Sequence, residues 1–164
     1  MATVAAGTLA PAFELTGMDG KLYRLEKALQ QGPILTAFFK VSCPTCQYTF
    51  PFAERIHQQL RPQGVQVWGI SQDDARASAR FAKEYGISFP FLIDDSPHQT
   101  SRIYGLKYVP TLFLVNRERQ VDLVSDGFSR VDLLEIQKRL ANHFSVTPPA
   151  LFLPEERVPE FKPG

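Results

Sequence analysis

Residues 34–46 read Ile-Leu-Thr-Ala-Phe-Phe-Lys-Val-Ser-Cys-Pro-Thr-Cys, an apolar run followed by a pair of cysteines. A short and almost uninterrupted apolar run, here residues 34–39, is typical of a strand buried on both faces of a sheet. From residue 44 to residue 60 the apolar residues fall on one side of a predicted helix. The sequence therefore places Cys43 and Cys46 where a buried strand gives way to a helix, and this unit decides the fold.

Strands and helices alternate on both sides of this unit. Further strands are predicted at residues 12–15, 22–25, 65–70, 89–93, 111–115 and 121–124. Further helices are predicted from Asp73 or Asp74 to Gly86, across residues 96–104, and after the capping box Ser129-Arg130-Val131-Asp132. The turn Asp19-Gly20 joins the first two strands into an N-terminal β-hairpin. We therefore expect an α/β fold with a mixed central sheet and helices on both of its faces.

The overall composition indicates one globular unit without a strongly charged surface. The chain has 164 residues, of which 44% are hydrophobic, and a formal net charge of +1. These values allow a packed core and do not favour nucleic acid or a membrane as a partner. No apolar run approaches the roughly 18 residues that span a bilayer, and the first residues lack the features of a secretory signal. We therefore expect a cytoplasmic location, or a periplasmic one if a leader has been removed.

The position of the two cysteines at the start of a helix points to redox chemistry. A helix N-terminus directs unpaired N–H groups and a partial positive charge at the first sulfur, which favours the thiolate form of Cys43. Only a thiolate attacks a disulfide, so Cys43 is the predicted nucleophile. Cys46, one helical turn further on and expected to be more buried, is within reach to resolve the mixed disulfide. Pro44 suits the first helical turn, where its missing N–H is not needed.

Two other roles for the cysteine pair fit the sequence less well. A structural disulfide that closes about four residues would remove only about 2 kcal/mol of chain entropy, and a reducing cytosol would break it. A zinc site would need two further ligands, and the histidines are scattered at His57, His98 and His143. We therefore predict no metal ion and no other cofactor.

A proline at the start of a predicted buried strand is the second informative feature. Pro110 cannot donate a hydrogen bond to the sheet, and a cis Val109–Pro110 bond would solve the local geometry. A trans proline that ends a loop is the alternative, since most X–Pro bonds in folded proteins are trans.

Several short motifs in a fixed order resemble the thioredoxin superfamily, in particular its redoxin branch with the AhpC/TSA and TlpA/ResA-like proteins. The matching stretches are Gly7-Thr-Leu-Ala-Pro-Ala-Phe-Glu-Leu15, Asp19-Gly-Lys21, Gly32-Pro-Ile-Leu-Thr-Ala-Phe-Phe39, Cys43-Pro-Thr-Cys46 with Pro51, Val67-Trp-Gly-Ile-Ser71, and Tyr104-Gly-Leu-Lys-Tyr-Val-Pro-Thr-Leu-Phe-Leu-Val115. Together they cover about residues 3–142. The resemblance implies a thioredoxin-like three-layer sandwich in which residues 74–93 form an inserted helix and strand.

The resemblance also implies where a substrate docks. Pro110 is expected to be cis, to lie against the cysteine pair and to line the groove that receives a substrate strand. The predicted substrate-binding residues are Pro44, Thr45, Val109 and Pro110.

Three positions depart from the family pattern. Ser42 stands where thioredoxins usually have Trp before the first cysteine. Ala37 and Thr49 stand where thioredoxins and ResA-like proteins, respectively, have an acidic residue. The group that accepts the proton of Cys46 is therefore left unassigned.

These features predict a thiol–disulfide oxidoreductase that exchanges protein dithiols and disulfides. Its partners would be a protein or small-molecule disulfide and an unidentified reductant, and in a reducing cytosol it would run as a reductase. A peroxiredoxin-like thiol peroxidase is the first alternative. Its Pro-x3-Thr/Ser-x2-Cys motif fits neither cysteine. If Cys43 were the motif cysteine, Thr36 would stand at the proline position and Lys40 at the Thr/Ser position; for Cys46 these residues would be Phe39 and Cys43. A non-catalytic thioredoxin-like binding or redox-sensing module is the second alternative.

Residues 145–164 differ in kind from the rest and are predicted to form an extended arm on a domain of residues 1–144. The arm holds prolines at 148, 149, 154, 159 and 163, interleaved with Leu151, Phe152, Leu153 and Phe161. Such a composition favours an extended, polyproline-like chain over a helix. The apolar residues could pack on the body, on a second subunit to form an oligomer, or across the groove at Pro110; a loosely held tail is the alternative.

Overall fold

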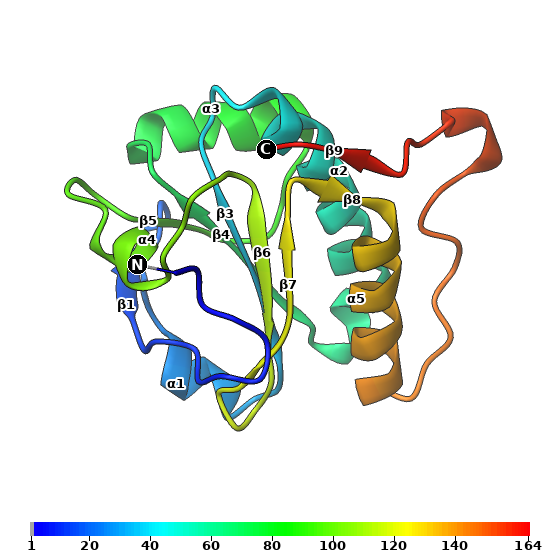
Figure 1. Cartoon of the computed structure of the whole chain (residues 1–164), viewed down its shortest axis with the longest axis horizontal. Helices are drawn as coiled ribbons and strands as arrows, with labels where there is room; N and C mark the ends of the chain where they lie inside the picture. The colour runs from blue at the N-terminus through cyan, green and yellow to red at the C-terminus, as the bar shows by residue number, and fades with distance from the viewer. Residues whose placement is uncertain (1) are drawn as a thin grey trace.

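A computed structural model describes residues 2–164 as a five-stranded mixed sheet with helices on both faces (Figure 1). The strands of this sheet are β3 (Ile34–Phe39), β4 (Gln66–Ser71), β5 (Phe91–Ile93), β6 (Thr111–Val115) and β7 (Val121–Asp126), in the spatial order β5-β4-β3-β6-β7. Two smaller sheets pair β1 (Glu14–Thr16) with β2 (Leu22–Arg24), and β8 (Phe128–Ser129) with β9 (Phe161–Lys162). The helices are α1 (Leu25–Leu29), α2 (Pro44–Leu60), α3 (Ala75–Tyr85), α4 (Gln99–Ile103) and α5 (Arg130–His143), with short 3₁₀ turns at Arg61–Gln63 and Pro154–Glu156.

Strand β3 lies at the centre of the sheet because all of its residues are apolar except Thr36, and all are buried. It pairs parallel with β4 and antiparallel with β6, and Phe38 stands opposite Thr111. This register puts the start of β6 beside the end of β3. The loops that carry Cys43 and Pro110 therefore meet at one edge of the sheet.

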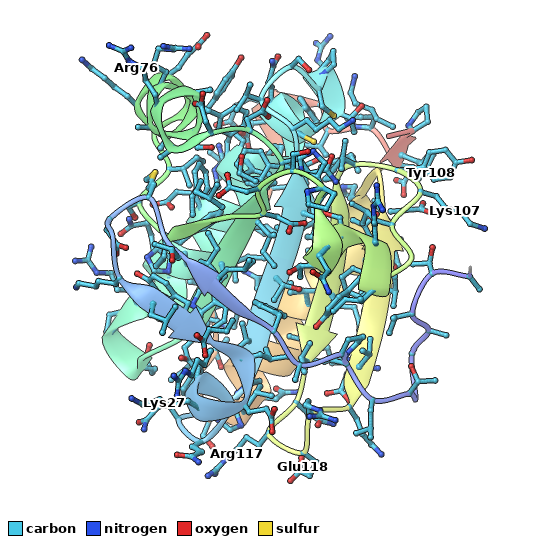
Figure 2. All side chains as sticks on the ribbon, turned by 90° about the vertical axis from the view of Figure 1, so that its left-hand side faces the viewer. Lys27, Arg76, Lys107, Tyr108, Arg117 and Glu118 are labelled. Atoms are coloured by element: carbon cyan, nitrogen blue, oxygen red, sulfur yellow. The ribbon has the colours of Figure 1, made fainter. Side chains whose placement is uncertain are left out.

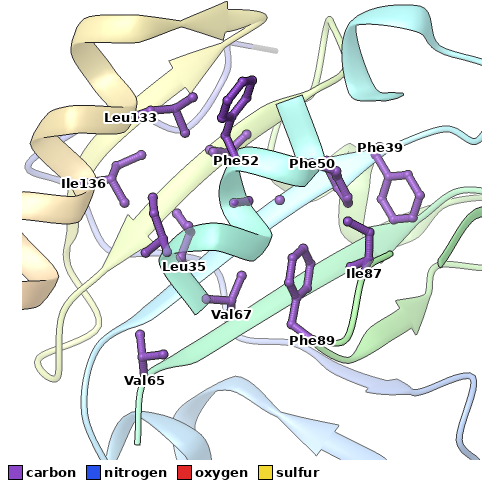
Figure 3. Close-up of a cluster of buried hydrophobic side chains, with 14 of the residues drawn as sticks. Leu35, Phe39, Phe50, Phe52, Val65, Val67, Ile87, Phe89, Leu133 and Ile136 are labelled. Carbon is purple, nitrogen blue, oxygen red and sulfur yellow. The ribbon is translucent and has the colours of Figure 1, made fainter. Parts of the chain in front are cut away.

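Alternate residues of β3 point to opposite faces of the sheet and enter two separate cores. Leu35 and Phe39 belong to the larger core, which also contains residues of α2, α3 and α5. Figure 3 shows the two side chains together with Phe50 of α2 and Leu133 of α5. The Phe39 ring centroid lies 4.4 Å from that of Phe50 in α2 and 5.0 Å from that of Phe81 in α3. These aromatic contacts hold the first turns of α2 against the sheet, and so fix the position of the cysteines.

The other face of the sheet is covered by the N-terminal hairpin, α1 and the segment around α4. Phe38 of β3 enters this second core. The only tryptophan of the chain, Trp68 in β4, is also buried there. Its ring packs edge to face against Tyr23 at 5.4 Å and Phe13 at 6.2 Å between centroids. With helices on both faces, the predicted three-layer sandwich and N-terminal hairpin are confirmed.

The predicted caps of the two long outer helices are also present. The Asp74 side chain accepts the N–H of Ala77 at 2.7 Å at the start of α3, and Ser129 accepts that of Asp132 at 3.2 Å at the start of α5. Gly86 ends α3 with φ +69°, a left-handed conformation that favours glycine. Most predicted bounds shift by one to three residues.

One predicted strand needs correction. The second strand of the hairpin ends at Arg24, and Leu25 opens the helix α1 rather than continuing the strand. Leu25 and Leu29 lie one helical turn apart and are both buried in the second core. The helical spacing of these two leucines therefore outweighs the alternation that suggested a longer strand.

The arm of residues 145–164 packs on the body of the molecule, which is one of the alternatives left open by the sequence. Leu151 is 1% exposed and belongs to the larger core. The Phe152 ring lies 5.0 Å from that of Phe52. Apart from the 3₁₀ turn the arm is irregular until β9, and it ends near the start of α2 (Figure 1). A domain boundary at residue 144 and an oligomer formed through the arm stay predictions.

Candidate functional site

The first cysteine caps the N-terminus of α2. Cys43 has an extended backbone conformation, and its sulfur accepts the N–H of Cys46 at 3.1 Å. Pro44 is the first helical residue, and the first turn of α2 contains no acidic residue. The helix therefore directs a backbone N–H group and the positive end of its dipole at the Cys43 sulfur, with no carboxylate in that turn to offset them.

The two cysteines differ sharply in their surroundings. Cys43 is partly exposed, whereas Cys46 is fully buried; neither forms a disulfide here. Burial is the main cause that raises the pKa of the Cys46 thiol, and its hydrogen bond with Cys43 and the nearby charges of Cys43 and Asp73 raise it further. The arrangement offers an accessible sulfur for attack and keeps a second, neutral thiol directly behind it.

The loop before β6 forms the opposite wall of the site. The Val109–Pro110 peptide bond is cis, as the resemblance implied. The Cys43 thiol donates to the Val109 carbonyl at a sulfur–oxygen distance of 3.4 Å. The Pro110 carbonyl accepts the N–H of Gly127 at 2.8 Å, and Thr111 Oγ1 donates to Tyr108 O at 2.7 Å. The first bond ties the loop to the residue after β7, and the second closes the turn around Pro110, with the Val109 carbonyl facing the nucleophile.

The structure thus brings together five of the six residues that the sequence singled out. Cys43, Cys46, Val109 and Pro110 meet at the edge of the sheet, as described above. The Thr45 hydroxyl donates to the carbonyl of Pro163, in the arm, at 2.6 Å. Pro44 is exposed at the outer side of the first turn.

Sequence reasoning missed Asp73 as a neighbour of the site. It follows β4, and one carboxylate oxygen accepts the N–H of Val41 at 2.8 Å, in the loop before Cys43. The sequence suggests Asp73 only as one of two possible helix caps, and Asp74 takes that role. The available signal is the predicted succession of strand, helix and strand, because such a unit has parallel strands whose carboxyl ends meet at the same edge when the strands are neighbours, as β3 and β4 are.

The two positions at which the resemblance implies an acidic residue are occupied by small or neutral side chains. Ala37 is fully buried in β3. Thr49 is buried in α2, where its hydroxyl donates to the Thr45 carbonyl at 2.7 Å. Asp73 is therefore the carboxylate whose charge bears on the Cys46 thiol.

Comparison with known proteins agrees with this geometry. The model of the AhpC/TSA family matches residues 6–124. The chain belongs to the AhpC/TSA family. The match runs from the N-terminal segment through the cysteine pair and Pro110 to β7, and leaves the arm outside it.

Similar proteins and structures include two named for thiol–disulfide exchange and one named as a peroxiredoxin. The thiol-disulfide oxidoreductase ResA of Bacillus subtilis (strain 168) is 29% identical over 126 residues, which is 76% of this chain and 69% of that protein. A crystal structure described as the thiol:disulfide interchange protein DsbE of Chlorobium tepidum superposes with a TM-score of 0.75 at 25% identity, over 87% of this chain and 99% of that one. Peroxiredoxin Bcp of Escherichia coli (strain K12) is 30% identical over 101 residues, or 62% of this chain and 64% of that protein.

These matches confirm the predicted family and the predicted class of activity, an oxidoreductase that works through a Cys-x-x-Cys pair. Within residues 2–164, no helix is long and apolar enough to cross a membrane.

Proposed function

We propose that this chain exchanges thiols and disulfides with polypeptide substrates, with Cys43 as the attacking sulfur and Cys46 as the resolving one. The observation that carries the proposal is the contrast between the two sulfurs. Cys43 is partly exposed, caps a helix N-terminus and contacts the Val109 carbonyl, whereas Cys46 is buried behind it. A nucleophile must be reached from solvent, and a resolving thiol need only reach its neighbour.

The reaction proceeds in two exchanges. The Cys43 thiolate attacks one sulfur of the substrate disulfide, a Cys43–substrate disulfide forms, and the other substrate sulfur leaves as a thiolate that takes up a proton. Cys46 loses its proton and attacks the Cys43 sulfur, which forms the Cys43–Cys46 disulfide and releases the second substrate thiol. Two electrons have then passed from the protein to the substrate, and an external dithiol must restore the reduced pair.

The direction of net exchange depends on the compartment. In a cytoplasmic location, which the sequence favours, the reduced pair is regenerated and the protein acts as a reductase. In an oxidising compartment, the same chemistry depends on delivery of electrons by a dedicated reductant. The reductant and the substrate are expected to bind the same groove beside Pro110, because both must bring a sulfur to Cys43.

The test compares the fully reduced protein with Cys43→Ser and Cys46→Ser variants, and measures second-order rates toward a peptide disulfide and toward hydrogen peroxide. We expect fast reaction with the disulfide, slow reaction with peroxide, and loss of both in Cys43→Ser. In Cys46→Ser the mixed disulfide should accumulate and appear in mass spectra as the protein plus one peptide. Accumulation in Cys43→Ser instead would reverse the two roles, and a faster peroxide reaction would favour the peroxidase alternative.

A further inference from the structure

The arm of residues 145–164 reaches the proposed substrate groove after passing along α2 and α5. Two sets of contacts fix this path. Leu151 is buried in the larger core, and the Arg55 guanidinium forms a bidentate ion pair with the Glu156 carboxylate, with hydrogen bonds of 2.6 and 2.5 Å. Arg55 also donates to the Leu151 carbonyl at 3.1 Å. These contacts direct the last residues of the described chain back over the start of α2 (Figure 1).

The arm then adds a strand to the edge of the site. Strand β9 pairs antiparallel with β8, with Lys162 opposite Phe128 and Phe161 opposite Ser129. The N–H of Arg130 extends this ladder to the Glu160 carbonyl at 2.9 Å. Pairing of an extended segment with an exposed strand is a common way for proteins to bind a peptide, because the backbone supplies the affinity.

The residues beyond β9 touch the same groups that are predicted to hold a substrate. Pro163 accepts the hydrogen bond of Thr45, which lies between the two cysteines. Gly164 is pressed against Val109, since a Cβ atom added to this glycine would lie 2.5 Å from the Val109 oxygen and 3.3 Å from Cβ of Tyr108. The Val109 oxygen is also the acceptor of the Cys43 thiol. Figure 2 shows Tyr108 at the surface beside this end of the arm.

We propose that residues 160–164 occupy the peptide-binding groove of the site as an internal competitor, which a polypeptide substrate must displace before its disulfide reaches Cys43. This inference rests on the proposed function, because it takes the groove beside Cys43 and Val109 as the substrate site. It also assigns the substrate class: an extended polypeptide segment that pairs with β8, as the arm does.

The contacts of the end segment suit a competitor that binds reversibly. The ladder between β8 and β9 is short, and Phe161 remains 54% exposed. The Lys162 ammonium lies over the Tyr48 ring, 4.9 Å from its centroid. Short ladders with exposed side chains open at low free-energy cost, whereas the anchor at Leu151 is buried and holds the arm close to the groove.

A substitution within β9 should release the end segment without altering the catalytic groups. Hydrogen-bonded and non-bonded residue pairs alternate along an antiparallel ladder. The Arg130–Glu160 pair is bonded, so the Phe128–Lys162 pair, two residues further along each strand, is the next bonded pair. Lys162→Pro removes the backbone donor at that position and the cation over Tyr48. Arg157→Gly is the matched control, because Arg157 lies in the same arm with φ +49°, a conformation that glycine adopts readily.

The experiment measures the rates at which each reduced protein reduces insulin, as a polypeptide disulfide, and hydroxyethyl disulfide, as a small one. If the end segment competes with polypeptides, Lys162→Pro should reduce insulin about three- to tenfold faster than the unaltered chain, with the small-disulfide rate unchanged. A synthetic peptide with the sequence of residues 158–164 should inhibit Lys162→Pro more strongly than the unaltered protein. Arg157→Gly should behave as the unaltered chain in all three assays.

Equal insulin rates for Lys162→Pro and the unaltered chain, together with faster amide exchange of Arg130 in the variant, would overturn the proposal and leave the oxidoreductase function intact. If no variant reduces either disulfide, the proposed function fails, and labelling of Cys43 still tests the arm. Faster reaction of Lys162→Pro with a maleimide that carries a polyethylene glycol chain, but not with iodoacetamide, would then support occupancy of the groove. Equal labelling rates with both reagents would refute it.

Discussion

Thr45 and Pro163 are 118 residues apart in the chain, yet the threonine hydroxyl donates a 2.6 Å hydrogen bond to the proline carbonyl. This bond joins one of the two residues between the cysteines to the arm, which lies outside the family match. The start of α2, next to the strand β3 and the cis-proline loop, is therefore in direct contact with the arm. The stability that the arm contributes and the reactivity of the cysteines can therefore be measured separately.

Leu151 should contribute to the stability of the whole molecule. Its side chain is 1% exposed in the larger core, so Leu151→Ala leaves a cavity and should lower the free energy of unfolding by about 2–4 kcal/mol. Leu153→Ala is the matched control, because Leu153 is 45% exposed and its loss should change stability by less than about 0.5 kcal/mol. Urea unfolding at neutral pH measures both. Equal effects of the two substitutions would mean that the arm is not part of the cooperative unit.

The ion pair between Arg55 and Glu156 should make the anchoring of the arm depend on acid. The hydrogen bonds from Arg55 and from the Leu153 N–H lower the pKa of Glu156 to about 2, below its ordinary value of 4.5. A lowered pKa stabilises the folded state above pH 4.5, and this contribution is lost as the pH falls toward about 2. The difference in melting temperature between the unaltered chain and Glu156→Gln should therefore be largest at neutral pH and disappear near pH 2.

The neighbouring Glu155 offers the control for this titration. Glu155→Gln removes one acidic charge from the same turn without touching Arg55, and should leave the pH dependence as it is. The loss in Glu156→Gln at neutral pH should be small, about 1 kcal/mol or less, because both side chains of the pair are partly exposed. A difference that grows on acidification would contradict the direction of the shift.

The Cys46 thiol should react with alkylating reagents only in strongly alkaline solution. Burial is the first cause of its raised pKa, and it persists when Cys43 is replaced. In Cys43→Ala the rate of reaction with iodoacetamide should still rise with pH above pH 9. For the same variant unfolded in urea, the rate should reach its plateau just above the pKa of a free cysteine. A plateau below pH 9 in the folded variant would show that Cys46 is not held as a neutral thiol.

The charge of Asp73 should raise the pKa of the Cys46 thiol by only a modest amount, because it is the smallest of the contributions to that pKa. In the Cys43→Ala background, Asp73→Asn should shift the alkylation profile of Cys46 to lower pH. The asparagine oxygen can still accept the N–H of Val41, so the loop should be retained. Asp74→Asn, which changes the next residue and caps the α3 helix equally well, should leave the profile unchanged.

Local patterns predicted the part of the fold that positions the cysteines. The apolar run of residues 34–39 and the helix from residue 44 to residue 60 coincide with β3 and α2, because a buried central strand and a capped helix leave strong signals in a single sequence. The cis bond before Pro110 came from the resemblance and not from residue spacing, which left a trans bond open.

Contacts between distant parts of the chain account for what the sequence did not predict. The start of α1 at Leu25 is an exception, because the Leu25–Leu29 spacing is local, but a helix of five residues is too short for its pattern to be separated from the strand-like alternation before it. Asp73 comes near Cys46 only because β4 is the parallel neighbour of β3. The path of the arm depends on the Arg55–Glu156 pair, and no periodicity links two residues 101 positions apart.

The single tryptophan lies on the face of the sheet away from the cysteines, edge to face with Tyr23 and Phe13. Its fluorescence therefore originates in the second core, where the hairpin and α1 pack. Thiol–disulfide exchange at Cys43 should leave this emission nearly constant, whereas loss of the hairpin from the sheet should shift it to longer wavelength. The chain thus contains an optical reporter of folding that is separate from its redox state, and the unfolding of oxidised and reduced protein can be compared with one unmodified signal.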